Sequence, residues 1–176
     1  PSFRKTMFRS VLAVVALAAV ALADDQADFA ALRGKIQSAL ASFDPAFVQK
    51  IQELGKNLDL SRNQKIAQIK EAVAALPADQ QEKAQKFMDF GLQKEQEMIT
   101  LAKSLIPDFS ADTQAVLNNI VSAYENGADT PTKTLVEQIK TIINGASDAV
   151  KAELKAAKSG LVDKVKDFAK SMIPAN

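Results

Sequence analysis

Apolar residues recur every three or four positions along most of this chain, which is the spacing that places side chains on one face of an α-helix. The first such stripe, between about residues 25 and 41, carries Phe29, Leu32, Ile36 and Leu40. From Ala78 to Ile106 the pattern continues with only Gly91 as a potential helix breaker, so it predicts one long helix. We find no credible β-strand. The sequence therefore predicts an all-α protein.

Local start and stop signals divide the pattern into helices. Asp44-Pro45 places a capping aspartate before a proline at the first helical position, and Ser61 with Gln64 forms the spacing of a capping box. Pro77 ends the helix that follows Ser61, because the residue before a proline is disfavoured in the helical region. Further signals predict breaks near Asp108 or Ser110, at Asn126-Gly127, at Thr130-Pro131 and at Asn144-Gly145.

Several of these segments occur twice. Asp59 and Asp129 begin similar turns 70 positions apart, and Gln68-Ile69-Lys70 returns as Gln138-Ile139-Lys140. The sequence Ala-Lys-Ser-Leu-Ile-Pro at 102–107 returns as Ala-Lys-Ser-Met-Ile-Pro at 169–174. We therefore predict a helical bundle of about seven helices, built from two tandem three-helix units plus an N-terminal helix. The predicted ranges are 24–42 for the N-terminal helix, 43–107 for unit 1 and 108–176 for unit 2.

The N-terminal region has the pattern of a secretory signal peptide at residues 7–23. A short basic start at Met7–Ser10 precedes thirteen apolar residues that end in Ala21-Leu22-Ala23. This apolar stretch is shorter than the roughly 20 residues that span a bilayer, so we expect no membrane span. Residues 1–6 precede a plausible initiator Met7 and are interpreted as leader or appended residues. The pattern predicts a secreted, extracellular protein.

Charge and composition exclude several classes of function. Cleavage after Ala23 would remove Arg4, Lys5 and Arg9, which leaves 19 basic and 21 acidic residues and a net charge of about −2. This balance argues against a nucleic-acid partner, which would need a basic surface. The chain has neither Cys nor His, and it carries no glycine-rich phosphate loop or zinc motif. We therefore predict that it is not an enzyme.

A run of motifs in the first unit resembles the secreted SXP/RAL antigens of nematodes. The resemblance rests on Phe43-Asp44-Pro45, the turn from Asn57 to Ser61, Gln64-Lys65, Gln68-Ile69 and Leu76-Pro77, and it covers about 45 residues. It implies a secreted helical antigen with a cation-binding domain. Its partners would then be host or parasite proteins.

Two interpretations of the polar turn remain open. Oxygen-bearing side chains occupy alternate positions at Asn57, Asp59, Ser61 and Asn63, as at the start of an EF-hand loop, and Asp129 is the counterpart of Asp59. However, Arg62 and Gln68 stand where an EF-hand needs a glycine and a bidentate glutamate. Helix capping and turn formation explain the pattern more simply. The alternative is a weak Ca²⁺ or Mg²⁺ site, because a tight site needs more carboxylates.

The long helix suggests a different ligand. Glu95 lies near the middle of its apolar stripe, and Phe87, Phe90 and Met98 lie on or beside that stripe. In the simpler interpretation Glu95 reaches water or a lysine at the rim, and the apolar face is plain core. In the other, the helices enclose a fatty acid or retinoid, and Glu95 or a rim lysine orients its head group. The sequence thus supports a secreted, non-enzymatic antigen-like binding protein, with a carrier of a small hydrophobic ligand as the alternative.

Overall fold

The computed structural model describes residue 38 and residues 40–171. The order of elements is α4 (Pro45–Lys56), α5 (Arg62–Ala74), α6 (Ala78–Leu105), the short 3₁₀ helix η2 (Ile106–Asp108), α7 (Ala111–Asn126), α8 (Thr132–Asn144) and α9 (Asp148–Ser171). The described part is thus all-α with six α-helices and no strand, which confirms the predicted fold class. The predicted signal peptide and most of the predicted helix at 24–42 lie outside the described residues.

The predicted helix starts are confirmed where local signals set them. The Asp44 side chain accepts hydrogen bonds from Ala46 N and Phe47 N, with Pro45 as the first residue of α4. Ser61 and Gln64 form the reciprocal capping box at the start of α5. The uninterrupted pattern from Ala78 onward forms the single helix α6, which ends within one residue of its predicted end.

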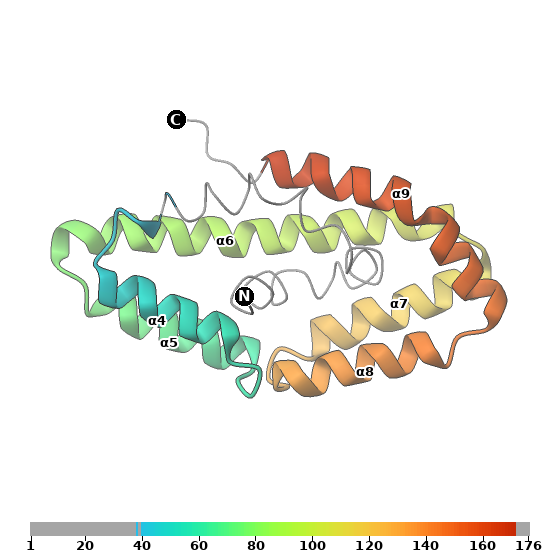
Figure 1. Cartoon of the computed structure of the whole chain (residues 1–176), viewed down its shortest axis with the longest axis horizontal. Helices are drawn as coiled ribbons and strands as arrows, with labels where there is room; N and C mark the ends of the chain where they lie inside the picture. The colour runs from blue at the N-terminus through green and yellow to red at the C-terminus, as the bar shows by residue number, and fades with distance from the viewer. Residues whose placement is uncertain (1–37, 39, 172–176) are drawn as a thin grey trace.

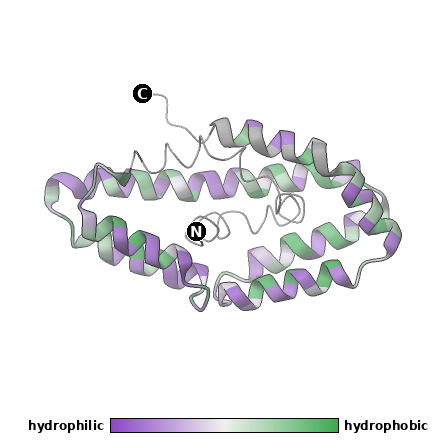
Figure 2. Ribbon diagram, in the orientation of Figure 1, coloured by the Kyte–Doolittle hydropathy of each residue, from purple (hydrophilic) through white to green (hydrophobic). Residues whose placement is uncertain are grey.

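Helix α6 spans the length of the molecule, and two helical hairpins lie along it (Figure 1). The α4–α5 hairpin lies beside one half of α6, and the α7–α8 hairpin lies beside the other half. Hydrophobic and hydrophilic residues are intermixed along each described helix, as expected for helices with one buried face (Figure 2). The helices are each too short or too polar, within the described part of the chain, to cross a membrane.

The core is divided between the two hairpins. One cluster contains Ala84 from the beginning of α6 packed with residues of α4, α5 and the segment before α4, including Phe43, Phe47 and Val73. Another contains Ile99 from the later part of α6, packed with residues of α7 and α8. A third, smaller cluster of Ile106, Leu117 and Val121 lies where η2 meets α7. Helix α6 therefore connects two cores that each belong to one hairpin.

Candidate functional site: a cavity between the two hairpins

The turns that join the helices of each hairpin pair with one another. Ser61 and Pro131 form an isolated antiparallel β-bridge between these turns. Three backbone amides donate across it, and the Thr132 hydroxyl adds a fourth bond by donating to Leu60 O at 2.8 Å. The amide donors are Asn63 N to Ala128 O at 3.0 Å, Thr132 N to Leu60 O at 3.1 Å and Lys133 N to Leu58 O at 2.8 Å. This pairing fixes the two hairpins end to end beneath α6.

The residues proposed as metal ligands lie in these paired turns, and the side chains of Asn57, Ser61, Asn63 and Asp129 make hydrogen bonds that build the turns. Asn57 Oδ1 accepts from Asp59 N at 3.0 Å, and Ser61, which is 1% exposed, caps α5. Asn63 Nδ2 donates to Asp129 Oδ1 at 2.8 Å, so the structure does bring these two residues together. No group of three or more acidic, His or Cys side chains suited to a metal ion occurs among the described residues. Weak Ca²⁺ or Mg²⁺ binding stays a prediction.

Glu95 of α6 is held by two residues from other helices. Arg62 Nη1 donates to Glu95 Oε1 at 2.8 Å, and the Tyr124 hydroxyl donates to the same oxygen. The Arg62 guanidinium also lies over the Tyr124 ring, 4.9 Å from its centroid. The Glu95 side chain is 13% exposed. The simpler interpretation of Glu95 expected water or a lysine at the rim, whereas the structure gives it an arginine and a tyrosine.

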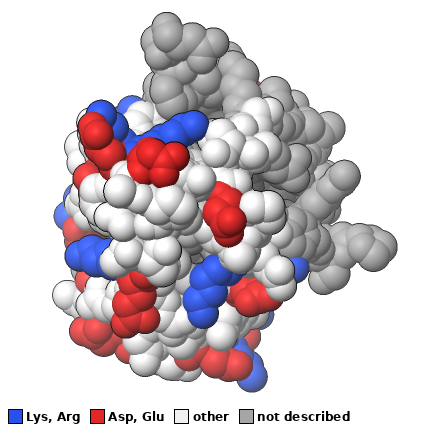
Figure 3. Space-filling view, turned by 90° about the vertical axis from the view of Figure 1, so that its left-hand side faces the viewer, with Lys and Arg blue, Asp and Glu red and all other residues white. Residues whose placement is uncertain are grey.

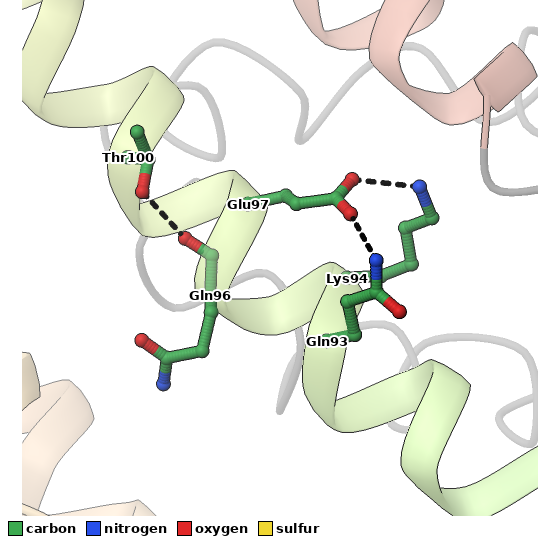
Figure 4. Close-up of polar contacts among 5 residues, drawn as sticks. All are labelled: Gln93, Lys94, Gln96, Glu97 and Thr100. Atoms are coloured by element: carbon green, nitrogen blue, oxygen red, sulfur yellow. Dashed lines mark hydrogen bonds and ion pairs between the residues drawn. The ribbon is translucent and has the colours of Figure 1, made fainter.

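Glu97, a second glutamate of α6, makes contacts within its own helix, unlike Glu95. Glu97 accepts hydrogen bonds from Lys94 and Gln93 of α6 itself, at 2.6 and 2.9 Å (Figure 4). Such contacts within one helix stabilise its surface and join nothing else. Glu95 instead connects α6 to α5 through Arg62 and to α7 through Tyr124. Glu95, Arg62 and Tyr124 together form the Glu95 cluster, which is a tertiary contact at the place where the hairpins meet.

Burial and neighbouring charges shift the acid–base behaviour of this cluster. Burial and the adjacent Glu95 carboxylate both raise the pKa of Tyr124, so its hydroxyl remains a proton donor over a wide pH range. Burial alone would lower the pKa of Arg62, but hydrogen bonding to Tyr124 and attraction to Glu95 outweigh it and the pKa is raised. Arg62 is therefore a permanent cation, and Tyr124 is a neutral hydroxyl.

Lys65 brings a second cation to the same region. It lies three residues after Arg62 on α5, so both side chains project from one helical face. Lys65 is only 7% exposed, and burial lowers its pKa. A lysine at this depth is unusual, because long charged side chains normally keep their ammonium group in water.

These charged residues line a cavity of about 260 Å³ between the hairpins. Its wall is otherwise dominated by apolar side chains of α4, α5 and α6, and it is completed by Tyr124, Leu135 and the turn before α8. The apolar wall includes Phe47, Ile51, Ile66, Ile69, Met88 and Leu92. The cavity therefore lies at the gap between the two core clusters, with residues of both contributing to it.

The four predicted ligand-binding residues separate into two pairs. Glu95 and Phe87 line the cavity. Phe90 and Met98 are not part of its lining: Phe90 lies beside Lys94, whose ammonium is 5.5 Å from the ring centroid, and Met98 is buried at 5% exposure. The difference follows from the breadth of the apolar stripe on α6, which packs against different helices along its length.

Sequence reasoning missed Arg62, Lys65 and Tyr124 as members of the site. In the sequence, Arg62 stands out only as a departure from an EF-hand loop. A signal was present, because a glutamate on an apolar stripe needs a cation or a donor from another helix. The chain's single tyrosine, on a buried helical face, was a natural candidate for that donor.

Comparison with protein-family models, curated proteins and solved structures finds no match to this chain.

Proposed function

We propose that this chain is a non-enzymatic binding protein that carries a small hydrophobic molecule in the cavity between its two hairpins. The observation that carries the proposal is the cavity itself: about 260 Å³, walled mainly by apolar side chains, with a few polar groups gathered at the Glu95 cluster. Pockets for small ligands have this composition, and their volumes begin near 300 Å³. A ligand of modest size, such as a medium-chain fatty acid or a compact retinoid, suits that space.

The surface of the molecule is consistent with this role. Acidic and basic side chains are interspersed over the face at the α4–α5 end of the molecule, without a large area of one sign (Figure 3). Such a surface favours solubility and offers no extended basic stripe to nucleic acid on that face. The proposal that the protein is secreted depends on the predicted signal peptide at residues 7–23. The proposal of an antigen-like protein with host or parasite partners depends on the family resemblance of the first unit alone.

We further infer that the hairpins derive from one duplicated unit, as the sequence echoes suggest. The bridged residues Ser61 and Pro131 differ by the same 70 positions as Asp59 and Asp129. Each hairpin is also capped by the long helix that follows it: Gln80 of α6 accepts from Asp44 N, and Glu153 of α9 accepts from Ser110 N. The cavity would then lie at a pseudo-symmetric junction, where the two copies meet.

The test of carrier function is binding of an uncharged, environment-sensitive dye such as Nile red to the full chain. We expect saturable fluorescence enhancement, and competition by a medium-chain alcohol. In Leu92→Trp a bulky ring is placed in the cavity wall, and we expect dye affinity to fall about tenfold or more, as for loss of a well-fitted apolar site.

Leu105→Trp provides the matched control, because Leu105 is also a half-buried leucine of α6 but does not line the cavity. Its dye affinity should stay near that of the wild type. Absence of saturable binding, or equal affinity in wild type and Leu92→Trp, would refute the proposal.

A further inference from the structure

One of the two carboxylate oxygens of Glu95 is engaged by other residues of the described chain, and the other is not. The hydrogen bonds from Arg62 Nη1 and from the Tyr124 hydroxyl both end on Oε1. In the described part of the chain, every fully buried side-chain oxygen or nitrogen has a hydrogen-bond partner. Oε2 receives no hydrogen bond from a described residue, so it is accessible, and Glu95 lies in the cavity wall. An accessible carboxylate oxygen is a strong acceptor for a ligand that carries a donor.

We propose that the cavity selects uncharged apolar molecules that end in a hydroxyl group, which donates to Glu95 Oε2 while the apolar part of the ligand lies against α4, α5 and α6. The apolar wall of the cavity comes from these three helices, for example from Phe47, Ile66 and Leu92. This inference rests on the proposed carrier function and narrows its ligand to one chemical class.

The Arg62 guanidinium beside Glu95 suits the second capacity of a hydroxyl group, which has one donor and two acceptor lone pairs. Arg62 has five N–H donors, and the structure shows one of them donating to Glu95. A ligand hydroxyl can therefore donate to Glu95 Oε2 and accept from another N–H of Arg62. The ion pair thus offers an acceptor and a donor side by side, and hydrogen bonds to charged partners are stronger than those between neutral groups.

Other head groups match this pair less well. An ionised carboxylate has no donor for Oε2 and would face the Glu95 carboxylate with a like charge. An ammonium group has donors, but it must leave water and approach the Arg62 cation, which lies 2.8 Å from Glu95. An ether or ester can only accept. A hydroxyl is the group that supplies both bonds at the small desolvation cost of an uncharged group.

The experiment compares two uncharged isomers, decan-1-ol and methyl nonyl ether, in displacing Nile red from the full chain. The two molecules have the same atoms and nearly the same length, but only the alcohol has a hydrogen-bond donor. We expect decanol to displace the dye at a roughly tenfold lower concentration than the ether, because a hydrogen bond to a charged acceptor is worth about that factor in affinity. Decanoate and decylamine, which carry the same ten-carbon chain, should both be weaker competitors than decanol.

Glu95→Gln replaces the accessible acceptor by a donor. Arg62 and Tyr124 both donate to the Oε1 position, so we expect the amide oxygen to take that place and the amide NH₂ to take the place of Oε2. The alcohol and the ether can both accept from this NH₂, so the preference for the alcohol should fall to about one. Glu97→Gln is the matched control, because Glu97 is a glutamate of the same helix that bonds within α6 and does not line the cavity. Its replacement should leave the preference unchanged.

The ether separates the possible outcomes, because it reports an intact cavity without using Glu95 Oε2. Retained ether affinity shows that Glu95→Gln has folded with its cavity formed; if that affinity is lost, the comparison of the two isomers on the wild type decides alone. Equal affinity of the wild type for the isomers, tighter binding of decanoate or decylamine than of decanol, or an unchanged preference in Glu95→Gln would overturn the inference but leave the carrier function standing. Failure of all four ligands to displace the dye, or absence of saturable dye binding, would overturn both.

Discussion

At the scale of single residues, Tyr124 is the most constrained group of the site. It is 3% exposed, its hydroxyl donates to Glu95, and its ring lies beneath the Arg62 guanidinium. Both burial and the Glu95 charge oppose ionisation of the hydroxyl, which raises the pKa of Tyr124 above its ordinary value of 10.0. Because the chain has only one tyrosine, the state of this residue can be followed without interference from others.

We predict that Tyr124 stays protonated in the folded protein at pH values above 10, where the tyrosine of the unfolded chain is ionised. A raised folded-state pKa means that the stabilisation is fully present below the unfolded pKa and is lost as the pH rises towards the folded one. Ultraviolet absorbance of tyrosinate, recorded in native buffer and in concentrated urea, measures the two titrations. Coincident titration curves would show that the hydroxyl is not held by Glu95 in solution.

Tyr124→Phe tests the same contact through stability. The variant keeps the ring beneath Arg62 but removes the donor to Glu95, so we expect a loss of about 1–2 kcal/mol in unfolding free energy at neutral pH. Its alkaline loss of stability should be smaller than that of the wild type. Ser104→Ala, which removes an exposed hydroxyl that bonds only within α6, should change stability little.

The sequence predicts the position of a single residue correctly where the periodicity of one helix is enough to place it. Glu95 could be placed on the apolar stripe of α6, because helical periodicity fixes which positions share a face. Its partners could not be placed, because Arg62 and Tyr124 lie 33 and 29 positions away in the chain. Which helix faces which is decided by packing of the whole molecule. Of the three residues of the Glu95 cluster, the sequence therefore identified Glu95 but not Arg62 or Tyr124.

At the scale of helices, the caps and breaks depend on local chemistry and were largely predictable. Asp44, Ser61 and Gln64 act within three residues of the position that they cap. The start of α7 is different: Ser110 is its N-cap residue, but its side chain makes no cap hydrogen bond to the helix. Glu153 of α9 instead accepts from Ser110 N and Oγ and from Thr113 Oγ1. Such a cap from a distant helix has no signature in local sequence.

We predict that Glu153 makes α7 sensitive to acid. Hydrogen bonds from Ser110 and Thr113 lower the pKa of Glu153 below its usual 4.5, so its stabilising effect is present above that pH and is lost as the pH falls through the folded-state value. In Glu153→Gln the amide oxygen can still accept from Ser110 N, as Gln80 does for Asp44 N. Melting temperatures measured from neutral pH to about pH 3 should therefore fall less steeply in this variant than in the wild type.

The control for this prediction is Glu137→Gln. Glu137 is exposed on α8 and pairs with Lys140 of the same helix, so its replacement should leave the acid dependence nearly unchanged. If Glu153→Gln shows the full acid dependence of the wild type, the carboxylate does not cap α7 in solution.

Two glycines at the helix level give opposite predictions for the same substitution. A methyl group on Gly127, where α7 ends, would lie 2.6 Å from Ala123 O and 2.9 Å from Leu135 Cδ1, so Gly127→Ala should cost about 1–3 kcal/mol of stability. At Gly91, within α6, a methyl group meets nothing within 4 Å. Gly91→Ala should therefore stabilise the protein by about 0.5–1 kcal/mol through higher helix propensity. Urea denaturation of both variants measures the difference; a shift of the same sign in both would contradict the packing at Gly127.

At the scale of the whole molecule, the two hairpins must be held in register for the cavity to exist. Their cores are separate clusters, and three features connect them: helix α6, the Glu95 cluster and the paired turns. The sequence indicated the turns and their 70-residue relation. It did not show that the turns bind each other, because backbone pairing between distant segments leaves no periodic pattern in either one.

The hydrogen bond from Asn63 Nδ2 to Asp129 Oδ1, at 2.8 Å, isolates the contribution of side chains to that pairing. We predict that Asn63→Ala and Asp129→Ala are each destabilising and that their effects do not add, with a coupling free energy of about 0.5–1 kcal/mol for an exposed bond to a charged acceptor. Urea denaturation of both single variants and the double variant measures this coupling. Asn63→Ala combined with Glu137→Ala, two residues for which the structure shows no shared bond, should be additive within about 0.5 kcal/mol. If the effects of Asn63→Ala and Asp129→Ala are additive, the turns separate in solution.

The cavity would then lack its fixed far wall, because Thr130, Thr132 and Leu135 reach it only while the turns are paired.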